Sequence, residues 1–393
     1  MRVLYEGAIF QMLRQGGVAR CFSELIQHLP SNCTPVLAGP AEDPPMVERS
    51  GFEFVGFQTE PAISWLRKWK RESMQRSIAA GFDSTQADVE HWTYYNGLCR
   101  RPLVRSSRPL VVTILDFVHE AFPSLDPSGK HIELKRRAIE LADHLICISH
   151  STFHELIKRH PAASSKASVI PLGTSLQDVQ PSPLPKQLCG RPYVLFVGRR
   201  NSYKNFSLVW HAWNRIQASL PNDACLAVAG PPVKRRERNE LEWDESKKVV
   251  SLPNVNDSVL RALYQHAKAF VFPSRAEGFG LPSLEAMACR TPVLISDLPV
   301  MREVAGDAGY YFGVDELSHL ADLFAAAIEN RLPAVEDVTG RGVERAKRFC
   351  WQTTAAKTAE VYQNVIRSSR NDAASESDGG RQTHSSTRRM HAA

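Results

Sequence analysis

Two carboxylates with seven residues between them bracket a glycine-containing turn in the second half of the chain. Glu277 lies in this turn, and Glu285 lies in the helix that is predicted to follow it. The apolar run Ala269–Phe272 predicts a buried strand before the turn, and Pro282 suits the first turn of a helix. The start of such a helix exposes backbone N–H groups that favour anions. Together these groups suit a ligand with hydroxyls at both ends and phosphates between them.

Two basic residues follow another predicted strand in the same half of the chain. The apolar run Tyr193–Val197 ends at Gly198, and Arg199 and Lys204 come soon afterwards. Ligands of α/β folds bind beyond the carboxyl ends of the strands, where these two cations would lie. Two fixed cations there could stabilise the negative charge that develops on a departing diphosphate. A solvated basic loop without a ligand is the alternative.

A pair of glycines near the N-terminus is a third candidate. Gly16 and Gly17 follow the first predicted strand and precede a helix with apolar periodicity. Two glycines at a strand-to-helix turn let the backbone approach a phosphate closely. A tight turn without a ligand is the alternative.

Asp116 and His119 follow the strand that is predicted at Leu110–Ile114. A general base must reach its proton within hydrogen-bonding distance, and either side chain could do so from the end of a strand. The alternative is that Asp116 caps the turn and His119 is packed structurally.

The elements that must position these residues alternate regularly along the chain. Short apolar runs alternate with longer amphipathic stretches in both halves, which predicts two Rossmann-like α/β domains with parallel sheets. The length of 393 residues also favours two domains. Strands are predicted at Val3–Tyr5, Pro35–Ala38, Glu53–Gly56, Val89–Trp92, Leu110–Ile114, His144–Ser149, Ser168–Ile170, Tyr193–Val197, Cys225–Ala229, Val249–Leu252, Ala269–Phe272, Val293–Ser296 and Tyr310–Phe312.

These elements predict where the domains begin and end. The N-terminal domain is expected over residues 1–175 and the C-terminal domain over residues 191–348. Residues 176–190 contain three prolines and no apolar period, which is typical of a linker. A helix is expected over residues 349–367. The polar residues 368–393 lack the apolar side chains that would offset ordering entropy, so we expect a disordered tail there.

The string Glu277–Ala288 closely resembles the E-x7-E signature of the retaining glycosyltransferases of family 4. Other segments also match this family, namely Gln15–Arg20, Val111–Pro123, Ala142–Ser149, Val197–Asn205 and Glu303–Ala308. The resemblance implies a GT-B fold, in which two Rossmann-like domains face a central cleft. It also implies that the helix over 349–367 crosses back onto the N-terminal domain.

The resemblance implies a role for each candidate residue. Glu277 would accept hydrogen bonds from the hydroxyls of the donor sugar, and Glu285 would accept both ribose hydroxyls. Arg199 and Lys204 would hold the diphosphate. Gly16 and Gly17 would face the cleft. The backbone N–H groups of Gly278, Phe279 and Gly280 would help Glu277 to bind the donor sugar, and Leu281 would lie near the phosphates at the helix start.

One position departs from the family pattern. Many members have a histidine where this chain has Leu115. We therefore transfer the role of that histidine to His119, so that the expected catalytic residues are Glu277, His119 and Asp116.

The activity implied by the resemblance is that of a retaining, mannosyltransferase-like hexosyltransferase. It would move a hexose from a nucleotide-sugar to a glycan or lipid-linked acceptor in bacterial surface polysaccharide or lipopolysaccharide assembly. Neither a cofactor nor a metal is expected, since the chain has no Asp-x-Asp sequence. A GT-B sugar-nucleotide epimerase or hydrolase and a non-catalytic carbohydrate-binding protein are the alternatives.

Composition sets broader limits. A hydrophobic content of 43% and a charged content of 23% are typical of a globular protein, and we expect a cytoplasmic location. The net charge of +6 suits anionic ligands, but no nucleic-acid-binding motif is present. The run Trp65–Arg71 mixes bulky apolar and basic side chains. It could contact an anionic membrane surface on the inner face of the plasma membrane, or it could be a surface helix with a docked apolar stripe.

Overall fold

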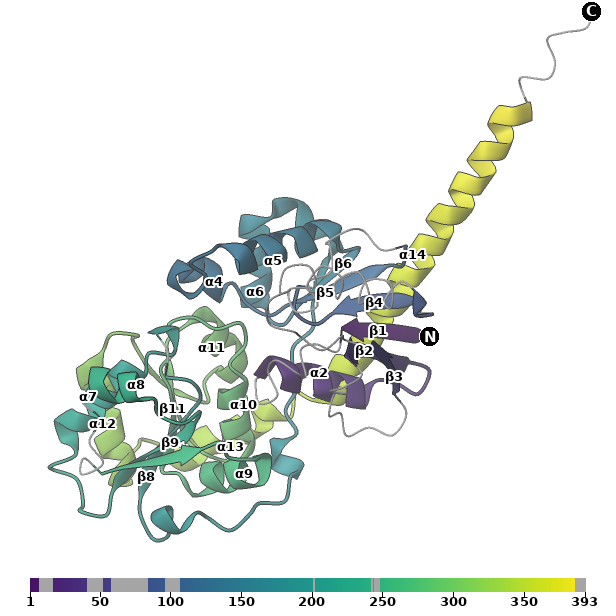
Figure 1. The fold of residues 1–393 in the computed structure, drawn as a ribbon. Coiled ribbons are helices and arrows are strands. Elements are labelled where there is room, and N and C mark those ends of the chain that lie inside the picture. The colour runs from purple at the N-terminus through teal and green to yellow at the C-terminus, as the bar shows by residue number, and fades with distance from the viewer. Residues whose placement is uncertain are drawn as a thin grey trace, which may run out of the picture.

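Two parallel sheets form the body of the protein (Figure 1). The computed structural model describes residues 1–6, 17–40, 52–57, 84–95, 107–200, 202–241, 243 and 248–385, with side chains described as far as 371. The two-domain parallel α/β class predicted from the sequence is confirmed.

The first sheet has seven strands in the order β3-β2-β1-β4-β5-β6-β7. All of its recorded strand pairs are parallel, and the strands β4 and β5 are buried along their whole length. Parallel sheets are covered on both faces, so such strands are buried along their length; β5 is almost entirely apolar, whereas β4 buries the polar side chains Glu90 and His91. The strands are β1 (Arg2–Glu6), β2 (Thr34–Pro40), β3 (Glu53–Phe57), β4 (Val89–Trp92), β5 (Leu110–Ile114), β6 (His144–Cys147) and β7 (Ala167–Val169).

Helices α2 (Gly17–His28), α4 (Val118–Ala121), α5 (Lys130–Leu141) and α6 (His150–Arg159) belong to this first domain. The 3-10 turns η1 (Pro123–Leu125) and η2 (Pro161–Lys166) complete its described helical elements. The predicted strand His144–Ser149 ends earlier than expected, at Cys147. The reason is local, because Ser149 is the N-cap of α6 and its side chain accepts the N–H of Thr152.

The second sheet has six parallel strands in the order β10-β9-β8-β11-β12-β13. They are β8 (Tyr193–Val197), β9 (Cys225–Gly230), β10 (Val249–Pro253), β11 (Ala269–Phe272), β12 (Val293–Ser296) and β13 (Tyr310–Phe312). The helices of this domain are α7 (Phe206–Ile216), α8 (Arg235–Glu240), α9 (Asp257–His266), α10 (Leu281–Ala288), α11 (Pro299–Ala305), α12 (Leu317–Ile328) and α13 (Val335–Ala346). The turn η5 (Ser202–Lys204) follows β8.

The segment between the sheets has little regular structure. It contains two short 3-10 turns, η3 (Leu176–Asp178) and η4 (Lys186–Leu188). Leu176 and Leu188 are both fully buried in the core of the second domain, so this segment is packed as well as connecting.

The last helix, α14 (Trp351–Ser385), leaves the second domain and packs on the first. Its buried side chains Ala355, Ala359 and Tyr362 share an apolar cluster with β1 and α2. Here the structure differs from the predicted disordered tail, because the helix continues from residue 368 to Ser385 and projects beyond the body (Figure 1). Extending an existing helix needs no new nucleation, and residues 368–385 contain no proline.

Candidate functional site

The turn between β11 and α10 carries the first of the two predicted glutamates. Gly280 ends this turn as the N-cap of α10 with a φ of 94°, a conformation that side chains other than glycine rarely adopt. Pro282 then lies in the first turn of the helix. The sequence Glu277–Pro282 therefore places a carboxylate and the free N–H groups of a helix start at the carboxyl end of β11.

Glu277 forms an ion pair with Lys204 from the end of the neighbouring strand β8. The distance from Nζ to Oε1 is 2.5 Å, and both side chains are largely buried. Lys204 Nζ also lies 5.2 Å from the ring centroids of Tyr203 and Phe272. Burial lowers the pKa of Lys204, but the attraction of Glu277, Tyr203 and Asp116 outweighs it, so the pKa lies above its usual value. Lys204 is therefore a fixed cation.

Asp116 of the first domain acts electrostatically on this part of the second domain. Its charge acts on Lys204 and Tyr203 of the second domain. Burial raises the pKa of Tyr94 to about 12. The charges of Asp116 and Tyr203 add to this shift, and the charge of Arg199 opposes it. These interactions bring together groups from the carboxyl ends of β4, β5 and β8. The exposed Arg199 lies at the edge of this group.

Tyr94 and Tyr203 were not predicted as site residues. Both lie near predicted features: Tyr94 is two residues after the strand at Val89–Trp92, and Tyr203 directly precedes Lys204. Position at a strand end is the signal that could have identified them.

The two predicted bases have different surroundings. The Oδ1 atom of Asp116 accepts the N–H of Val118 at 3.0 Å, so this side chain does cap the turn while its charge reaches the second domain. The His119 ring lies on the His131 ring, with centroids 3.9 Å apart. Among the described residues, the buried Nδ1 of His119 has no hydrogen-bond partner. The charge of Asp116 thus acts on Lys204 of the second domain, whereas His119 packs within the first domain.

Glu285 is the more deeply buried of the two glutamates, with 4% of its surface exposed. Its Oε1 atom lies 3.2 Å from Nη1 of Arg20, which comes from α2 of the first domain. Arg20 also pairs with Asp257 at 3.1 Å. Burial raises the pKa of Glu285 and Asp257 adds to this, while Arg20 opposes the shift; the net effect is upward. Arg20 belongs to the segment Gln15–Arg20 that matches the family, but its pairing with Glu285 could not be predicted from the sequence.

The remaining predicted residues differ in how deeply they are buried. Phe279 is 3% exposed and its ring packs edge-on against Phe349, so its side chain anchors the loop. Gly278 packs against the first domain, and Leu281 begins α10. Gly17 begins α2 and is exposed, whereas Gly16 lies outside the described residues.

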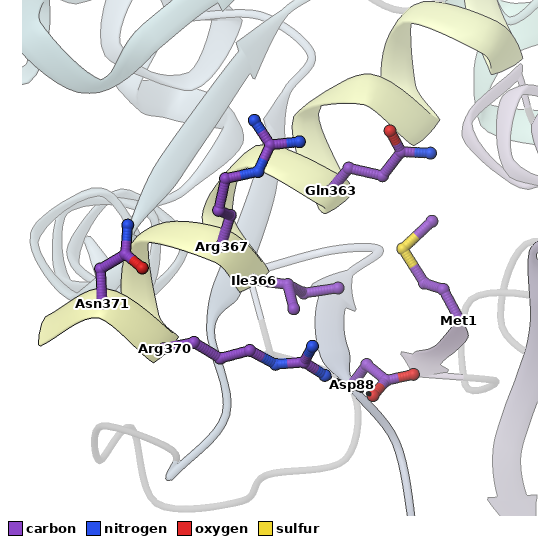
Figure 2. Close-up of a pocket in the computed structure, with 7 residues that line it drawn as sticks. All are labelled: Met1, Asp88, Gln363, Ile366, Arg367, Arg370 and Asn371. Carbon is purple, nitrogen blue, oxygen red and sulfur yellow. Dashed lines mark ion pairs between the residues drawn. The ribbon is translucent and has the colours of Figure 1, made fainter. Parts of the chain in front are cut away.

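A separate hollow of about 450 Å³ lies at the opposite edge of the first sheet (Figure 2). It is lined by Met1, Asp88, Gln363, Ile366, Arg367, Arg370 and Asn371. Met1 and Asp88 directly precede β1 and β4, so this hollow adjoins the amino ends of the strands. It is therefore not part of the site at their carboxyl ends.

The described residues can also be compared with what metal binding and membrane contact require. Within the described ranges, no group of three or more His, Cys, Asp or Glu side chains could hold a metal ion. In the same ranges, no helix has the length and apolar character needed to cross a membrane. The run Trp65–Arg71, predicted to contact a membrane surface, lies outside the described residues.

Two protein families together match most of the chain. The family model described as glycosyl transferases group 1 matches residues 186–344, and the model described as glycosyltransferase family 4 matches residues 15–178. The chain is 29% identical over 182 residues to O-antigen chain mannosyltransferase B of Escherichia coli, covering 45% of this chain and 47% of that protein. It is 29% identical over 269 residues to a D-inositol 3-phosphate glycosyltransferase of Kineococcus radiotolerans, covering 61% of each. The matches thus span about half of the length of these relatives.

Two solved structures share the fold over nearly the whole chain. Sucrose-phosphate synthase from Thermosynechococcus elongatus superposes with a TM-score of 0.73 and 20% identity, covering 94% of this chain and all of that one. The Anabaena protein HepE, solved in complex with UDP and glucose, superposes with a TM-score of 0.68 and 18% identity, covering 93% of this chain and all of that one. At these identities the likeness concerns the GT-B fold.

Proposed function

Because this chain belongs to family 4 of the glycosyltransferases, we propose that it moves a hexose from a nucleoside-diphosphate-sugar to an acceptor hydroxyl. The observation that carries the proposal is the Lys204–Glu277 pair, which lies at the carboxyl ends of β8 and β11. The charge of Asp116, from the other domain, also acts on Lys204. A fixed cation beside a carboxylate suits a diphosphate joined to a sugar.

Each end of the donor has a group that suits it. The Glu277 carboxylate would accept hydrogen bonds from the sugar hydroxyls, and Glu285 would accept those of the ribose. Arg199 and Lys204 would pair with the diphosphate between them. Binding would require the two carboxylates to exchange part of their present contacts with Lys204 and Arg20 for contacts with the ligand.

We propose that the reaction retains the configuration at the anomeric carbon. The bond between the anomeric carbon and the phosphate oxygen breaks, and its electron pair stays on the phosphate. The acceptor oxygen bonds to the same face of the sugar, and its proton passes to the leaving phosphate oxygen. Arg199 and Lys204 stabilise the charge on the leaving group, so we propose that turnover needs no added metal. Asp116, with His119 as the second candidate, would orient the acceptor hydroxyl.

The relatives suggest the substrates. Their names include O-antigen chain mannosyltransferases, so we propose mannose as the hexose and a glycan or lipid-linked acceptor in bacterial surface polysaccharide assembly. We propose that the enzyme works in the cytoplasm, with peripheral contact to the inner face of the plasma membrane. The UDP and glucose bound by HepE make UDP-glucose the second donor to test.

The test is donor turnover by wild-type protein and by Glu277→Ala. Release of the nucleoside diphosphate from GDP-mannose and UDP-glucose is measured with and without acceptor glycans, and with EDTA. We expect Glu277→Ala to lose about a hundredfold in turnover, since it removes hydrogen bonds to a charged group. Glu344→Ala is the matched control, because Glu344 is exposed and pairs with Lys347, which directly follows the same helix. Undiminished turnover by folded Glu277→Ala would overturn the site, and an epimerised sugar from donor alone would indicate an epimerase.

A further inference from the structure

The carbonyl of Gly278, in the middle of the donor loop, is held by two hydroxyls of the other domain. Ser149 Oγ donates to this oxygen at 2.7 Å, and Thr152 Oγ1 donates to it at 3.1 Å. Ser149 is fully buried and Thr152 is 3% exposed. Buried hydrogen bonds of this kind are expensive to lose, because the carbonyl would remain without its partners and without water.

The local structure of α6 aims both hydroxyls at the loop. Ser149 lies two residues after β6 and is the N-cap of α6, and its side-chain oxygen accepts the N–H of Thr152 at 2.9 Å. This cap leaves the hydroxyl hydrogen of Ser149 available for the Gly278 carbonyl. Thr152 lies in the first turn of the helix, with its Oγ1 atom 3.0 Å from Ser149 Oγ, so both hydroxyls reach the same oxygen.

Gly278 approaches the first domain more closely than any residue with a side chain could. A Cβ atom at this position would lie 1.7 Å from the carbonyl oxygen of Leu115 and 2.8 Å from its carbonyl carbon. The φ of Gly278 is not positive, so the position needs glycine for the close approach and not for its conformation. The loop is therefore clamped between the end of β5 and the start of α6.

A second contact joins the start of α6 to the second domain, this time with a side chain of the second domain as the acceptor. The carboxylate of Glu303, on α11 of the second domain, accepts the N–H groups of His150 and Ser151 at 2.7 and 3.0 Å. These are the first two residues of α6, where orphan donors favour an anion. The start of α6 thus gives hydroxyl donors to the donor loop of the second domain and backbone donors to its helix α11.

We propose that Ser149 and Thr152 are positioning residues of the donor site, so that the first domain sets the geometry of the loop that grips the sugar. Because the peptide unit is planar, fixing the Gly278 carbonyl also fixes the direction of the Phe279 N–H. It fixes the backbone next to Glu277 as well. The inference rests on the proposed function, since it assigns these residues to the donor site named there.

The test compares three threonine variants in the full-length protein. Thr152→Val removes the hydroxyl at nearly constant volume, and Thr152→Ser keeps it. Thr358→Val is the matched control, because Thr358 is 2% exposed and its hydroxyl binds the Thr354 carbonyl within α14, away from the donor loop. The measurements are kcat and KM for GDP-mannose and UDP-glucose, together with the melting temperature of the ligand-free protein.

We expect Thr152→Val to raise the KM for the nucleotide-sugar about tenfold, and Thr152→Ser to stay within about threefold of wild type. Thr358→Val should lower the melting temperature similarly and leave KM unchanged, which separates positioning from stability. The role is overturned if Thr152→Val and Thr358→Val have the same KM.

A measurement that needs no substrate accompanies these kinetics. Amide hydrogen exchange over residues 277–284 in the ligand-free protein should be faster in Thr152→Val than in Thr358→Val. Equal exchange in the two variants would contradict the positioning role. If wild-type protein consumes neither nucleotide-sugar, the proposed function fails and the donor-site role fails with it. If wild type is active and Thr152→Val has the same KM and the same hydrogen exchange as Thr358→Val, only the positioning role fails.

Discussion

The two glutamates of the E-x7-E signature are equivalent in sequence but not in environment. Glu277 pairs with Lys204 of its own domain, whereas Glu285 pairs with Arg20 of the other domain. Glu285 is also the more buried, and burial raises its pKa. A ligand that reaches Glu285 must therefore share it with Arg20, which couples donor binding to the contact between the domains.

Replacing Glu285 by glutamine tests its role as a ligand for the nucleotide. Glu285→Gln keeps the shape of the side chain but loses the charge that would accept two ribose hydroxyls. We expect the Kd for the nucleoside diphosphate to rise about tenfold to a hundredfold, measured by titration calorimetry.

Asp257→Asn is the matched control for this variant. Asp257 also pairs with Arg20, but about half of its side chain is exposed. We expect the Kd of Asp257→Asn for the nucleoside diphosphate to stay within about threefold of wild type, because a surface ion pair contributes little. An equal loss in both variants would indicate that Glu285 acts only through Arg20.

At the scale of elements, a buried polar network attaches α14 to the first sheet. The Tyr362 hydroxyl lies 2.6 Å from Nδ1 of His91 and 2.8 Å from the hydroxyl of Tyr5. The other nitrogen of His91 lies 2.7 Å from Thr113 Oγ1. The network thus joins β1, β4, β5 and the last helix.

Burial lowers the pKa of His91 from 6.5 to about 3. Below pH 6.5, His91 therefore binds a proton in the unfolded chain but not in the folded protein. Stability falls as the pH drops below the unfolded value, and the loss continues until the folded pKa is reached. We expect His91 to account for a loss of about 2 kcal/mol between about pH 7 and pH 5.

Urea unfolding at several pH values measures this loss. His91→Gln cannot titrate, so its free energy of unfolding should fall less steeply with decreasing pH than that of wild type. His28→Gln serves as the control, since His28 is only partly buried. Parallel pH profiles for wild type and His91→Gln would contradict the assignment.

At the scale of the whole molecule, contacts of the donor loop and of helices α2, α6, α10 and α11 join the two domains at the carboxyl ends of their sheets. Arg20 reaches Glu285, the Gly278 carbonyl reaches α6, and Glu303 caps the same helix. All three contacts surround the donor loop. We interpret this arrangement as a closed one, in which water would be kept away from an activated sugar.

Glu303→Gln should weaken the closed arrangement. The amide is uncharged, so it pairs less well with the N–H groups at the start of α6. Loss of a helix cap costs about 1 kcal/mol, which corresponds to about a fivefold shift toward open molecules. Small-angle X-ray scattering of the ligand-free protein should give a larger radius of gyration than wild type. Glu344→Gln, which changes a charge within one domain, should not differ from wild type, and an unchanged radius in both variants would refute the capping role.

Much of the architecture could be predicted from the sequence, because its signals are local. Each strand of the two sheets was predicted to within a few residues, since buried parallel strands are short apolar runs between turns. Gly280 and Pro282 likewise mark the start of α10 by their own backbone preferences. The end of α14 was not predicted, because residues 368–385 have no apolar period by which to recognise a helix.

The partners of the site residues were decided by the tertiary structure alone. Arg20 and Glu285 are far apart in sequence, as are Ser149 and Gly278. Local spacing carries no information about which loops meet when two domains face each other, since the docking of whole sheets sets those distances. The sequence therefore determined which side chains stand at the strand ends, and only the packing of one domain against the other decided which of them touch.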